Sequence, residues 1–479
     1  QYPYGCLEQT VSAAFPQLYY ADLAAALEPG APGGGAKATR FNPTWHVQEA
    51  IRKLEAMQQP DGSLTYWPGG TETNWWASAY AAHFLTEAQK AGQHVSRPVL
   101  DKLLAYLAAQ TRPRPTVRET VLDAQGRPTA RVIARREAVY SLYVLALNQQ
   151  ADASALNYYK TNLPLLAAES RYLLAAALTV SGNAPAARAV VPVAFSRTSE
   201  AAGRNLSGDF ASPTRDAALG LLALLDAAPN HPTVPTLARR LSQQLRGPGW
   251  YSTQERAFAL LALGRQARRD AGSTVTATLT QGARQLGAFN GPPLTLARGL
   301  TGQSVQLKTS GKGTLYFTKE LEGIPLSGRA TPLVDENLLV RRDFLTRDGA
   351  PWPIAATGAT LRQGDLVVVR LTLQCAATVP SVPNVALTDL LPAGLEIENP
   401  RLGAQRELQW AVPNYEPDYL DVRDDRLSVF TTATPEPKVF YYLARAVTAG
   451  SYEQAPVTAA AMYDATYRST SGGGVVRVR

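Results

Sequence analysis

Two residues near the start of the chain have the types and the spacing to bond covalently with each other. Cys6 and Gln9 belong to the segment Pro3-Tyr4-Gly5-Cys6-Leu7-Glu8-Gln9-Thr10. Proline and glycine there favour a turn, and the residues after them favour the start of a helix. Residues three positions apart share a helix face, so the Cys6 sulfur and the Gln9 carboxamide carbon can meet. Attack of the sulfur would expel ammonia and leave an intrachain thioester.

The position of Cys6 in the first turn of this predicted helix adds to its reactivity. A helix N-terminus favours thiolate over thiol and makes such a cysteine more nucleophilic than a buried structural one. The pattern Cys-x-x-Gln alone is common by chance, and the alternative is a partly buried cysteine at a helix start. The residues around Cys6 separate these two interpretations.

The string from Pro3 to Gln9 resembles the thioester motif of the α2-macroglobulin and complement family, with Pro3, Tyr4, Gly5 and Glu8 supporting the reactive pair. Leu7 stands where vertebrate members usually carry glycine, and it resembles the bacterial branch. The segment Gly249-Trp250-Tyr251-Ser252-Thr253-Gln254-Glu255 is similar to a late helix of the family's thioester domain. The resemblance covers essentially the whole chain.

The resemblance implies a covalent trap for proteinases. In this family a proteinase cuts a bait region elsewhere in the protein, the trap rearranges, and the exposed thioester acylates lysine amines of the attacking proteinase. Such a protein reacts once and is not an enzyme. The resemblance also implies upstream domains of the same protein as partners, and a periplasmic or cell-envelope location through a lipid anchor on a preceding part, facing host or competitor proteinases.

Histidines bear on the choice of target. Some members of the family use a histidine to pass the acyl group from sulfur to hydroxyls. The sequence has His46, His83, His94 and His231, and none lies between residues 112 and 137, where that histidine would align. We therefore expect a preference for amines and interpret the four histidines as surface or packing residues.

A thioester needs protection from water until it is triggered. Tyr2 and Tyr4 flank the motif, and Met462-Tyr463-Asp464 resembles a segment of the bacterial family's last domain that packs against the thioester. Tyr2, Tyr4, Met462 and Tyr463 are therefore candidate shield residues. The alternative for Met462 and Tyr463 is an ordinary place in a strand or loop of the core.

The fold that must position these residues changes character once along the chain. About the first 270 residues are rich in Ala and Leu with helical periodicity, and similar helix starts recur at Trp76, Arg136, Thr214 and Thr253. Repeated helical hairpins form either a closed ring or an open solenoid, and periodicity does not distinguish the two. The resemblance implies an α/α toroid.

From Thr274 onward, β-branched residues alternate with polar ones in short runs. Strands are expected at 274–280 and 313–319, with a turn at 291–293. An antiparallel β-sandwich is expected from strands at 338–344, 366–373, 386–389, 407–412, 427–431, 439–446 and 475–478. We therefore predict an α/α toroid with the thioester over 1–272, the second half of a CUB-like β domain over 273–325, and a macroglobulin-like sandwich over 326–479.

Composition excludes several other classes. A chain of 479 residues with 45% hydrophobic and 18% charged residues can form packed cores. Its net charge of +8 is scattered, so we predict no nucleic-acid partner. No apolar run is long enough to span a membrane. Two cysteines exclude a disulfide scaffold, Cys375 is interpreted as a buried thiol, and no motif indicates a metal or an organic cofactor.

A rival hypothesis is a glycan- or ligand-binding module with a degenerate thioester, used for adhesion or as a scaffold. Trp67, Trp75 and Trp76 could form a carbohydrate platform, since helical toroids also occur in glycan-active enzymes. A toroid hydrolase would need two positioned carboxylates, and Asp61 and Glu72 have no helix-spaced partner. Aromatic residues clustered at helix starts more often pack between repeats.

Overall fold

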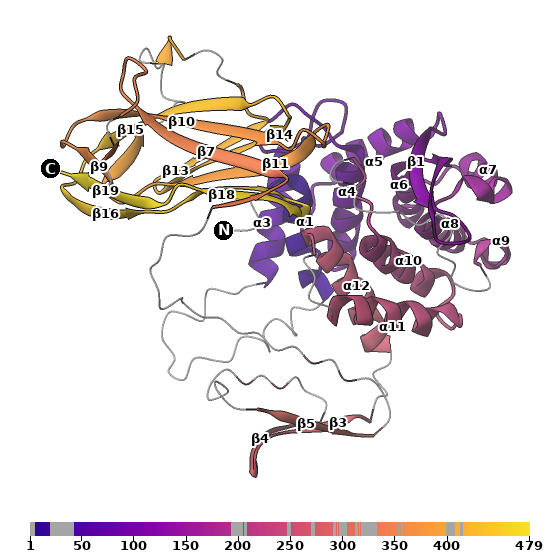
Figure 1. The fold of residues 1–479 in the computed structure, drawn as a ribbon. Helices are drawn as coiled ribbons and strands as arrows, with labels where there is room; N and C mark the ends of the chain where they lie inside the picture. The colour runs from indigo at the N-terminus through magenta and orange to yellow at the C-terminus, as the bar shows by residue number, and fades with distance from the viewer. Residues whose placement is uncertain are drawn as a thin grey trace. The chain divides into compact units, whose positions relative to one another are not determined.

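The computed structural model divides into two compact parts, unit 1 (1–322) and unit 2 (323–479), each considered by itself (Figure 1). The structure describes residues 5–19, 43–192, 205, 208–246, 251–269, 274–290, 294, 296, 304–311, 315, 317, 333–352, 354–355, 358–398, 408–411 and 415–479. Helices precede mainly antiparallel sheets, as predicted. The domain boundaries after residues 272 and 325 stay predictions.

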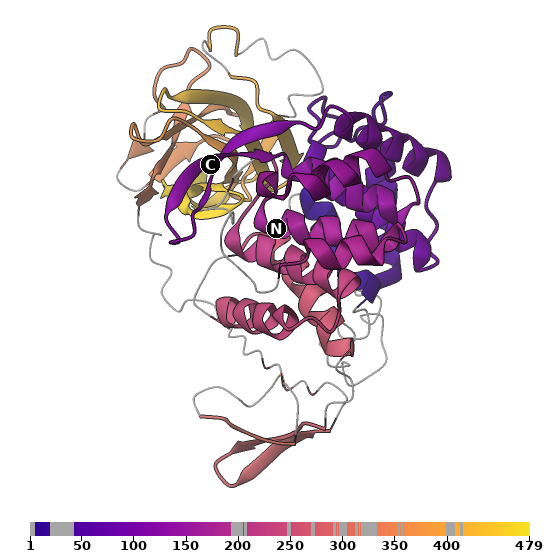
Figure 2. The same cartoon turned by 90° about the vertical axis from the view of Figure 1, so that its right-hand side faces the viewer.

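Six of the described helices of unit 1, here called the ring helices, contact one another in a closed series. They are α1 (Leu7–Ala14), α4 (Trp75–Lys90), α6 (Arg136–Leu147), α8 (Ala168–Val180), α10 (Pro213–Ala227) and α12 (Thr253–Arg269). Each packs on the next in this order, and α12 packs on α1. Figure 2 shows the helices of unit 1, coloured from indigo to pink, gathered in one body. The four helix starts predicted from repeats belong to α4, α6, α10 and α12, which confirms them.

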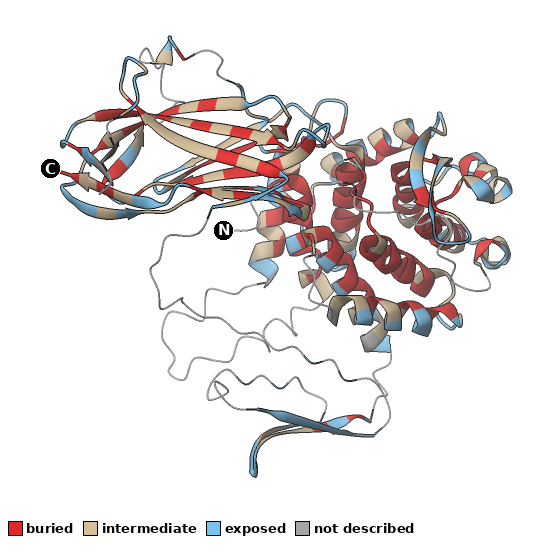
Figure 3. Cartoon of the chain, viewed as in Figure 1, coloured by how far each residue is buried: buried red, intermediate tan, exposed pale blue. Residues whose placement is uncertain are grey.

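A second set of helices lies against the ring helices. These are α3 (Pro43–Ala56), α5 (Arg97–Thr111), α7 (Ala153–Thr161), α9 (Ala184–Val190) and α11 (Thr233–Arg246). The ring helices α1, α4, α6, α8 and α10 are buried along most of their length, and α12 is buried mainly in its N-terminal half. The second set alternates buried and exposed residues (Figure 3). A helix that is apolar all round needs cover on every side, and the amphipathic second set supplies it.

An unpredicted hairpin separates α5 from α6. Its strands, β1 (Thr116–Leu122) and β2 (Pro128–Ala134), pair antiparallel along their full length. The Asp123 carboxylate shapes the turn, since it accepts hydrogen bonds from the backbone N–H groups of Gln125 and Arg127, both at 2.8 Å. This insertion lengthens the interval between the repeat starts at Trp76 and Arg136 to 60 residues, against 39 residues between those at Thr214 and Thr253.

A three-stranded sheet ends the described part of unit 1. It has the order β4-β3-β5, with β3 (Thr276–Gln281), β4 (Arg284–Phe289) and β5 (Gln306–Ser310). The predicted strand at 274–280 is confirmed as β3. The predicted turn at 291–293 lies outside the described residues, as does the predicted strand at 313–319 except for positions 315 and 317.

Unit 2 consists of sheets with the orders β12-β15-β10-β7, β13-β14-β11-β17-β18-β6 and β16-β19-β9-β8. Their strands are β6 (Val334–Glu336), β7 (Leu338–Leu345), β8 (Ile354–Ala355), β9 (Gly358–Leu361), β10 (Leu366–Cys375), β11 (Val382–Leu390), β12 (Leu395–Glu398), β13 (Tyr419–Arg423), β14 (Arg426–Ala433), β15 (Lys438–Ala446), β16 (Gly450–Gln454), β17 (Val457–Ala461), β18 (Asp464–Ser471) and β19 (Gly474–Val478).

Two of these sheets are joined by buried side chains. The Tyr442 hydroxyl of β15 donates to the Asp389 carboxylate of β11 at 2.7 Å, and Arg342 of β7 pairs with the same carboxylate. Burial raises the pKa of Asp389, while Arg342 and Tyr442 lower it. A buried carboxylate needs such partners, so this contact fixes how the two sheets face each other.

One predicted strand of unit 2 is wrong. The stretch 407–412 alternates in polarity like a strand, but its described residues Leu408 to Trp410 form a turn. Trp410 donates from Nε1 to the Arg347 carbonyl at 2.6 Å and meets the Tyr441 ring edge-on. Its side chain packs on the Tyr441 ring of the sheet, so the segment adds no strand.

Among the helices the structure describes, none is long and apolar enough to cross a bilayer.

Candidate covalent site at the start of α1

Cys6 and Gln9 occupy two defined positions at the N-terminus of α1. Cys6 is the N-cap, with φ −63° and ψ 165°, and its carbonyl accepts the first helical hydrogen bond from Thr10 N–H at 2.9 Å. The sequence placed Cys6 inside the first turn, and the structure corrects this by one position. Gln9 is then N3, the position whose side chain reaches back to the N-cap in a capping box. The Cys-x-x-Gln spacing thus places the carboxamide on the one residue of the first turn whose side chain can reach back to the N-cap.

The neighbouring ring helix α12 shows the same two positions in use. Ser252 is the N-cap there and Glu255 is N3. The Glu255 N–H donates to the Ser252 hydroxyl at 3.2 Å, and the Ser252 N–H donates to the Glu255 carboxylate at 2.8 Å. A residue three positions into a helix therefore reaches its N-cap in this fold.

Gly5 sets the direction in which the chain enters α1. Its φ is +94°, a conformation that residues with a side chain rarely adopt. A Cβ added at Gly5 would meet nothing within 4 Å, so backbone conformation and not space requires the glycine. The other predicted motif residues, Pro3 and Tyr4, and the candidate shield residue Tyr2 lie outside the described residues.

The first turn of α1 is tied to the loop before α4 and to α12. The Leu7 N–H donates to the Tyr66 carbonyl at 2.9 Å. The Glu8 carboxylate accepts hydrogen bonds from the hydroxyls of Ser12, at 2.6 Å, and Thr253, at 2.9 Å. Cys6, Glu8 and Gln9 are all 0% exposed. A reactive bond at this place would be held rigidly and screened from bulk water.

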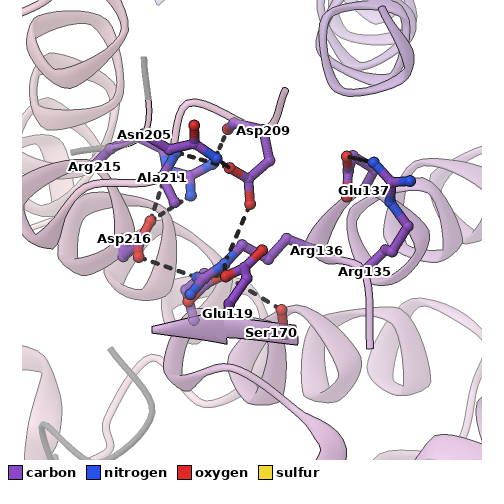
Figure 4. A network of polar contacts seen from close by, with 11 residues as sticks. Glu119, Arg135, Arg136, Glu137, Ser170, Asn205, Asp209, Ala211, Arg215 and Asp216 are labelled. Atoms are coloured by element: carbon purple, nitrogen blue, oxygen red, sulfur yellow. Dashed lines mark hydrogen bonds and ion pairs between the residues drawn. The ribbon is translucent and has the colours of Figure 1, made fainter. Parts of the chain in front are cut away.

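The starts of several ring helices share a group of charges, here called the arginine cluster. Its members are the buried Arg136, Arg215, Glu169, Asp209 and Asp216 and the half-buried Glu119, and Figure 4 shows all of them but Glu169 labelled. The Arg136 guanidinium is within 2.6 Å of Glu169, 3.1 Å of Asp216 and 3.2 Å of Asp209. The cluster joins the starts of α6, α8 and α10. These helices therefore begin at the same face of the ring.

Two contacts explain how the arginine cluster is balanced. The Arg215 guanidinium pairs with Asp216 at 2.5 Å and lies over the Trp76 ring at 4.2 Å. Burial raises the pKa of Glu169 to about 7, against the opposing effect of Arg136.

Sequence reasoning missed the arginine cluster. The sequence signal is a charged pair at the start of an otherwise apolar helix, as at Arg136-Glu137 and Arg215-Asp216. A charge in such a helix becomes buried and therefore requires a partner of opposite charge.

The histidines lie in unrelated places. His83 of α4 is buried, with Nδ1 2.8 Å from the Tyr140 hydroxyl and its ring edge-on to Phe15. Burial lowers the pKa of His83 to about 4, so it is a neutral packing residue at pH 7. His94 is exposed, and His46 and His231 are half-buried.

Met462 and Tyr463 form the tip of the β17–β18 hairpin in unit 2, between the paired residues Ala461 and Asp464. Both side chains are buried, and the Met462 N–H donates to the Asn384 carbonyl at 2.9 Å. Hairpin tips usually carry small polar residues or glycine, so two large apolar side chains here are unusual.

Cys375 at the end of β10 is buried, and burial raises the pKa of its thiol.

The tryptophans proposed as a carbohydrate platform do not form one. Trp76 is fully buried within the ring, and Trp67 is 5% exposed. Trp75 is half-buried and donates from Nε1 to the Ser141 hydroxyl at 3.0 Å. Trp75 and Trp76 thus pack between α4 and α6. Within the described residues, no group of His, Cys, Asp and Glu has a geometry that could hold a metal ion.

Comparison with known proteins gives consistent matches. Residues 338–465 match the model of the bacterial α2-macroglobulin MG10 domain. The α2-macroglobulin of Xylella fastidiosa (strain Temecula1) is 32% identical, over 98% of this chain and 28% of that protein. That of Escherichia coli K12 is 30% identical over the same shares. The chain thus spans little more than a quarter of the length of these relatives.

Solved structures are similar over the whole chain. Salmonella α2-macroglobulin reacted with methylamine gives a TM-score of 0.75 at 26% identity, over 100% of this chain and 30% of that one. Native E. coli α2-macroglobulin from domain MG7 to the C-terminus gives 0.73 at 26% identity, over 100% of this chain and 74% of that one. The similarity includes the helices of unit 1 as well as the sheets of unit 2.

Proposed function

Because this chain belongs to the bacterial α2-macroglobulin family, we propose that it is the part of a proteinase inhibitor that carries the reactive thioester. The bond joins Cys6 Sγ to Gln9 Cδ, and it acylates amines of a trapped proteinase in a single turnover. The observation that carries this proposal is the placement of Cys6 at the N-cap and Gln9 at N3 of the buried first turn of α1.

The proposed chemistry has two steps. In the first, Cys6 Sγ attacks Gln9 Cδ, the Cδ–N bond breaks, and ammonia leaves with the thiol proton. In the second, a lysine amine of the target attacks the same Cδ, the Cδ–S bond breaks, and the proton released by the amine neutralises the thiolate. The product is an amide between Gln9 and the target, with a Cys6 thiol. A thioester carbonyl is electrophilic because sulfur donates little into it.

The preference for amines is part of the proposal. An acyl relay to hydroxyls needs an imidazole beside the thioester. His83 is instead hydrogen-bonded to Tyr140, and His46, His94 and His231 lie on α3, in the loop after α4 and in the loop before α11. None of these three histidines lies on a ring helix, which supports direct attack by amines without a histidine relay.

We also propose that Met462 and Tyr463, together with Tyr2 and Tyr4, shield the thioester. Support comes from the two apolar side chains at the tip of the β17–β18 hairpin, where the turn itself does not require them. In the same scheme the ring helices are an α/α toroid, residues 273–325 are the second half of a CUB domain, and residues 326–479 are a macroglobulin-like sandwich.

The whole protein supplies what this chain does not contain. Since the relatives are more than three times as long, we propose that the bait region and further domains lie in other parts, with a lipid anchor that holds the protein in the periplasm or cell envelope. Proteinases with accessible lysines are the proposed partners. The methylamine-reacted Salmonella structure supports methylamine as a small probe for the same chemistry.

Methylamine labelling followed by peptide mass mapping tests the proposal. The expected result is one methylamide at Gln9 and one new thiol at Cys6. The label should disappear in Cys6→Ala and persist in Cys375→Ser, which is the matched cysteine control. Labelling elsewhere, or labelling that survives Cys6→Ala, would contradict the proposal.

A further inference from the structure

Phe210 has an unusual backbone for an aromatic residue. Its φ is +51°, in the left-handed region, although its side chain is large and 5% exposed. Such a conformation is strained for a bulky residue and persists only where the surrounding structure enforces it. The residues on both sides of Phe210 show how it is enforced.

Asp209 and Ala211 are fixed by the arginine cluster (Figure 4). The Asp209 carboxylate contacts Arg136 Nε at 3.2 Å and accepts the Ala211 N–H at 3.1 Å. The Asp209 carbonyl accepts a hydrogen bond from Arg215 Nη1 at 3.1 Å. Arg136 and Arg215 are buried and charged, so the backbone on either side of Phe210 has little freedom to relax.

The neighbouring residues extend this anchoring to other helices. Asn74, the N-cap of α4, donates from Nδ2 to the Gly208 carbonyl at 2.9 Å. Ser212, the N-cap of α10, donates from its hydroxyl to Glu255 at 2.7 Å. The loop 208–212 is therefore held at both ends by the starts of ring helices.

The strained backbone points the Phe210 ring at Tyr66. The two rings stack with centroids 6.0 Å apart and an interplanar angle of 17°. The Tyr66 carbonyl accepts the N–H of Leu7, the residue that follows Cys6, at 2.9 Å. A continuous series of contacts thus runs from the arginine cluster through Phe210 and Tyr66 to the first turn of α1.

We infer that Phe210 is a positioning residue for the Cys6–Gln9 pair: it fixes Tyr66, and Tyr66 fixes the N-terminus of α1. The inference rests on the proposed thioester. Bond formation requires the sulfur and the carboxamide carbon to be aligned, and a displacement of about 1 Å can reduce such a rate by about 100-fold. The ion pairs of the arginine cluster hold this alignment. Their buried charges cannot exchange these partners for water without a change in the fold.

The test measures the fraction of freshly purified chains that carry the thioester, by intact mass, together with the melting temperature. Phe210→Leu keeps an apolar side chain but removes the stacked ring, whereas Phe210→Tyr keeps the ring. Tyr159→Ala is the control for stability, since Tyr159 is a buried aromatic residue of α7, whose packing partners are α8 and a short turn beyond it.

Phe210→Leu should lower the thioester fraction at least about tenfold. Phe210→Tyr should retain the wild-type fraction. Tyr159→Ala should lower the melting temperature without changing that fraction, which separates positioning from general stability. Tyr66→Leu removes the same stack from the other side and should behave like Phe210→Leu, so the test holds even where one variant does not fold.

Two results would count against the inference in different ways. A wild-type chain with the thioester and an unchanged fraction in both Phe210→Leu and Tyr66→Leu would overturn the positioning role alone. A wild-type chain that retains the full sequence mass and both thiols would overturn the proposed function and, with it, this inference.

Discussion

The Glu8 carboxylate accepts a hydrogen bond from the Thr253 hydroxyl at 2.9 Å, although the two residues are 245 positions apart in the chain. Glu8 lies between Cys6 and Gln9, and Thr253 is the first residue of α12. Their contact closes the series of ring helices at the candidate site. It also gives a buried carboxylate one of its partners, which makes the contact important for stability.

Thr253→Val should therefore destabilise the chain by about 1–3 kcal/mol, because Glu8 stays buried and loses a hydrogen bond. Thr253→Ser keeps the hydroxyl and should stay close to the wild type. Urea unfolding of unit 1, followed by tryptophan fluorescence, measures both. Equal stabilities for the valine and serine variants would show that the contact contributes nothing.

Arg136 and Arg135 offer a comparison between neighbours in the chain. Arg136 is 0% exposed and contacts several buried carboxylates, whereas the Arg135 side chain is 43% exposed and pairs with Glu137. Arg136→Met leaves those carboxylates without their cation and should cost about 3–5 kcal/mol. Arg135→Met should cost at most about 1 kcal/mol. Unfolding free energies of similar size for the two variants would contradict this account of the cluster.

His83 should make stability depend on pH. Burial lowers its folded-state pKa from 6.5 to about 4, so the unfolded chain takes up the proton first. The contribution is complete above pH 6.5 and is lost as the pH falls toward 4, by up to about 3 kcal/mol. Unfolding free energies measured across that window, for the wild type and for His83→Gln, give the difference.

Glu169 titrates with the opposite sign. Because burial raises its pKa to about 7, it contributes stability below its ordinary pKa of 4.5 that is lost as the pH rises through 7. His83→Gln leaves Glu169 in place, so the difference between the two proteins isolates the histidine. A difference that does not change with pH would show that folding does not lower the pKa of His83.

Tyr463 tests the proposed shield. If the tip of the β17–β18 hairpin protects the thioester, Tyr463→Gly should accelerate its reaction with methylamine by about tenfold or more, since water and amines gain access. Tyr415→Gly removes a tyrosine of unit 2 that is 38% exposed and serves as the control. Reaction rates followed by thiol release should rise in the first variant only. A rate unchanged in Tyr463→Gly would assign Met462 and Tyr463 to packing.

The repeated helix starts were predictable because ring helices carry a common pattern. Trp76, Arg136, Thr214 and Thr253 all open apolar helices, and each start is within one residue of the structure. The hairpin β1–β2 was missed between two of them, although Asp123 and Gly126 are typical turn residues. The alternating runs that form its strands are short and lie between two segments with helical periodicity, so the helical pattern dominates this part of the sequence.

Other features depend on contacts distant in sequence. The turn at Trp410 looked like a strand, because alternation is the same whether a segment pairs in a sheet or packs on its outer face. Arg136 and Asp216 are 80 positions apart, so their pairing follows only from the closed series of helices. The strain at Phe210 has no signal in the sequence at all, because positive φ is usually found at glycine or asparagine.

The central claim is the bond between Cys6 and Gln9, and the most direct measurement is the intact mass of the purified chain with a thiol count before and after methylamine. The account predicts a chain lighter than its sequence by one ammonia. It should show one thiol on denaturation, from Cys375, and two after reaction with methylamine. A chain of full sequence mass with two thiols from the start, unchanged by methylamine, would contradict the account.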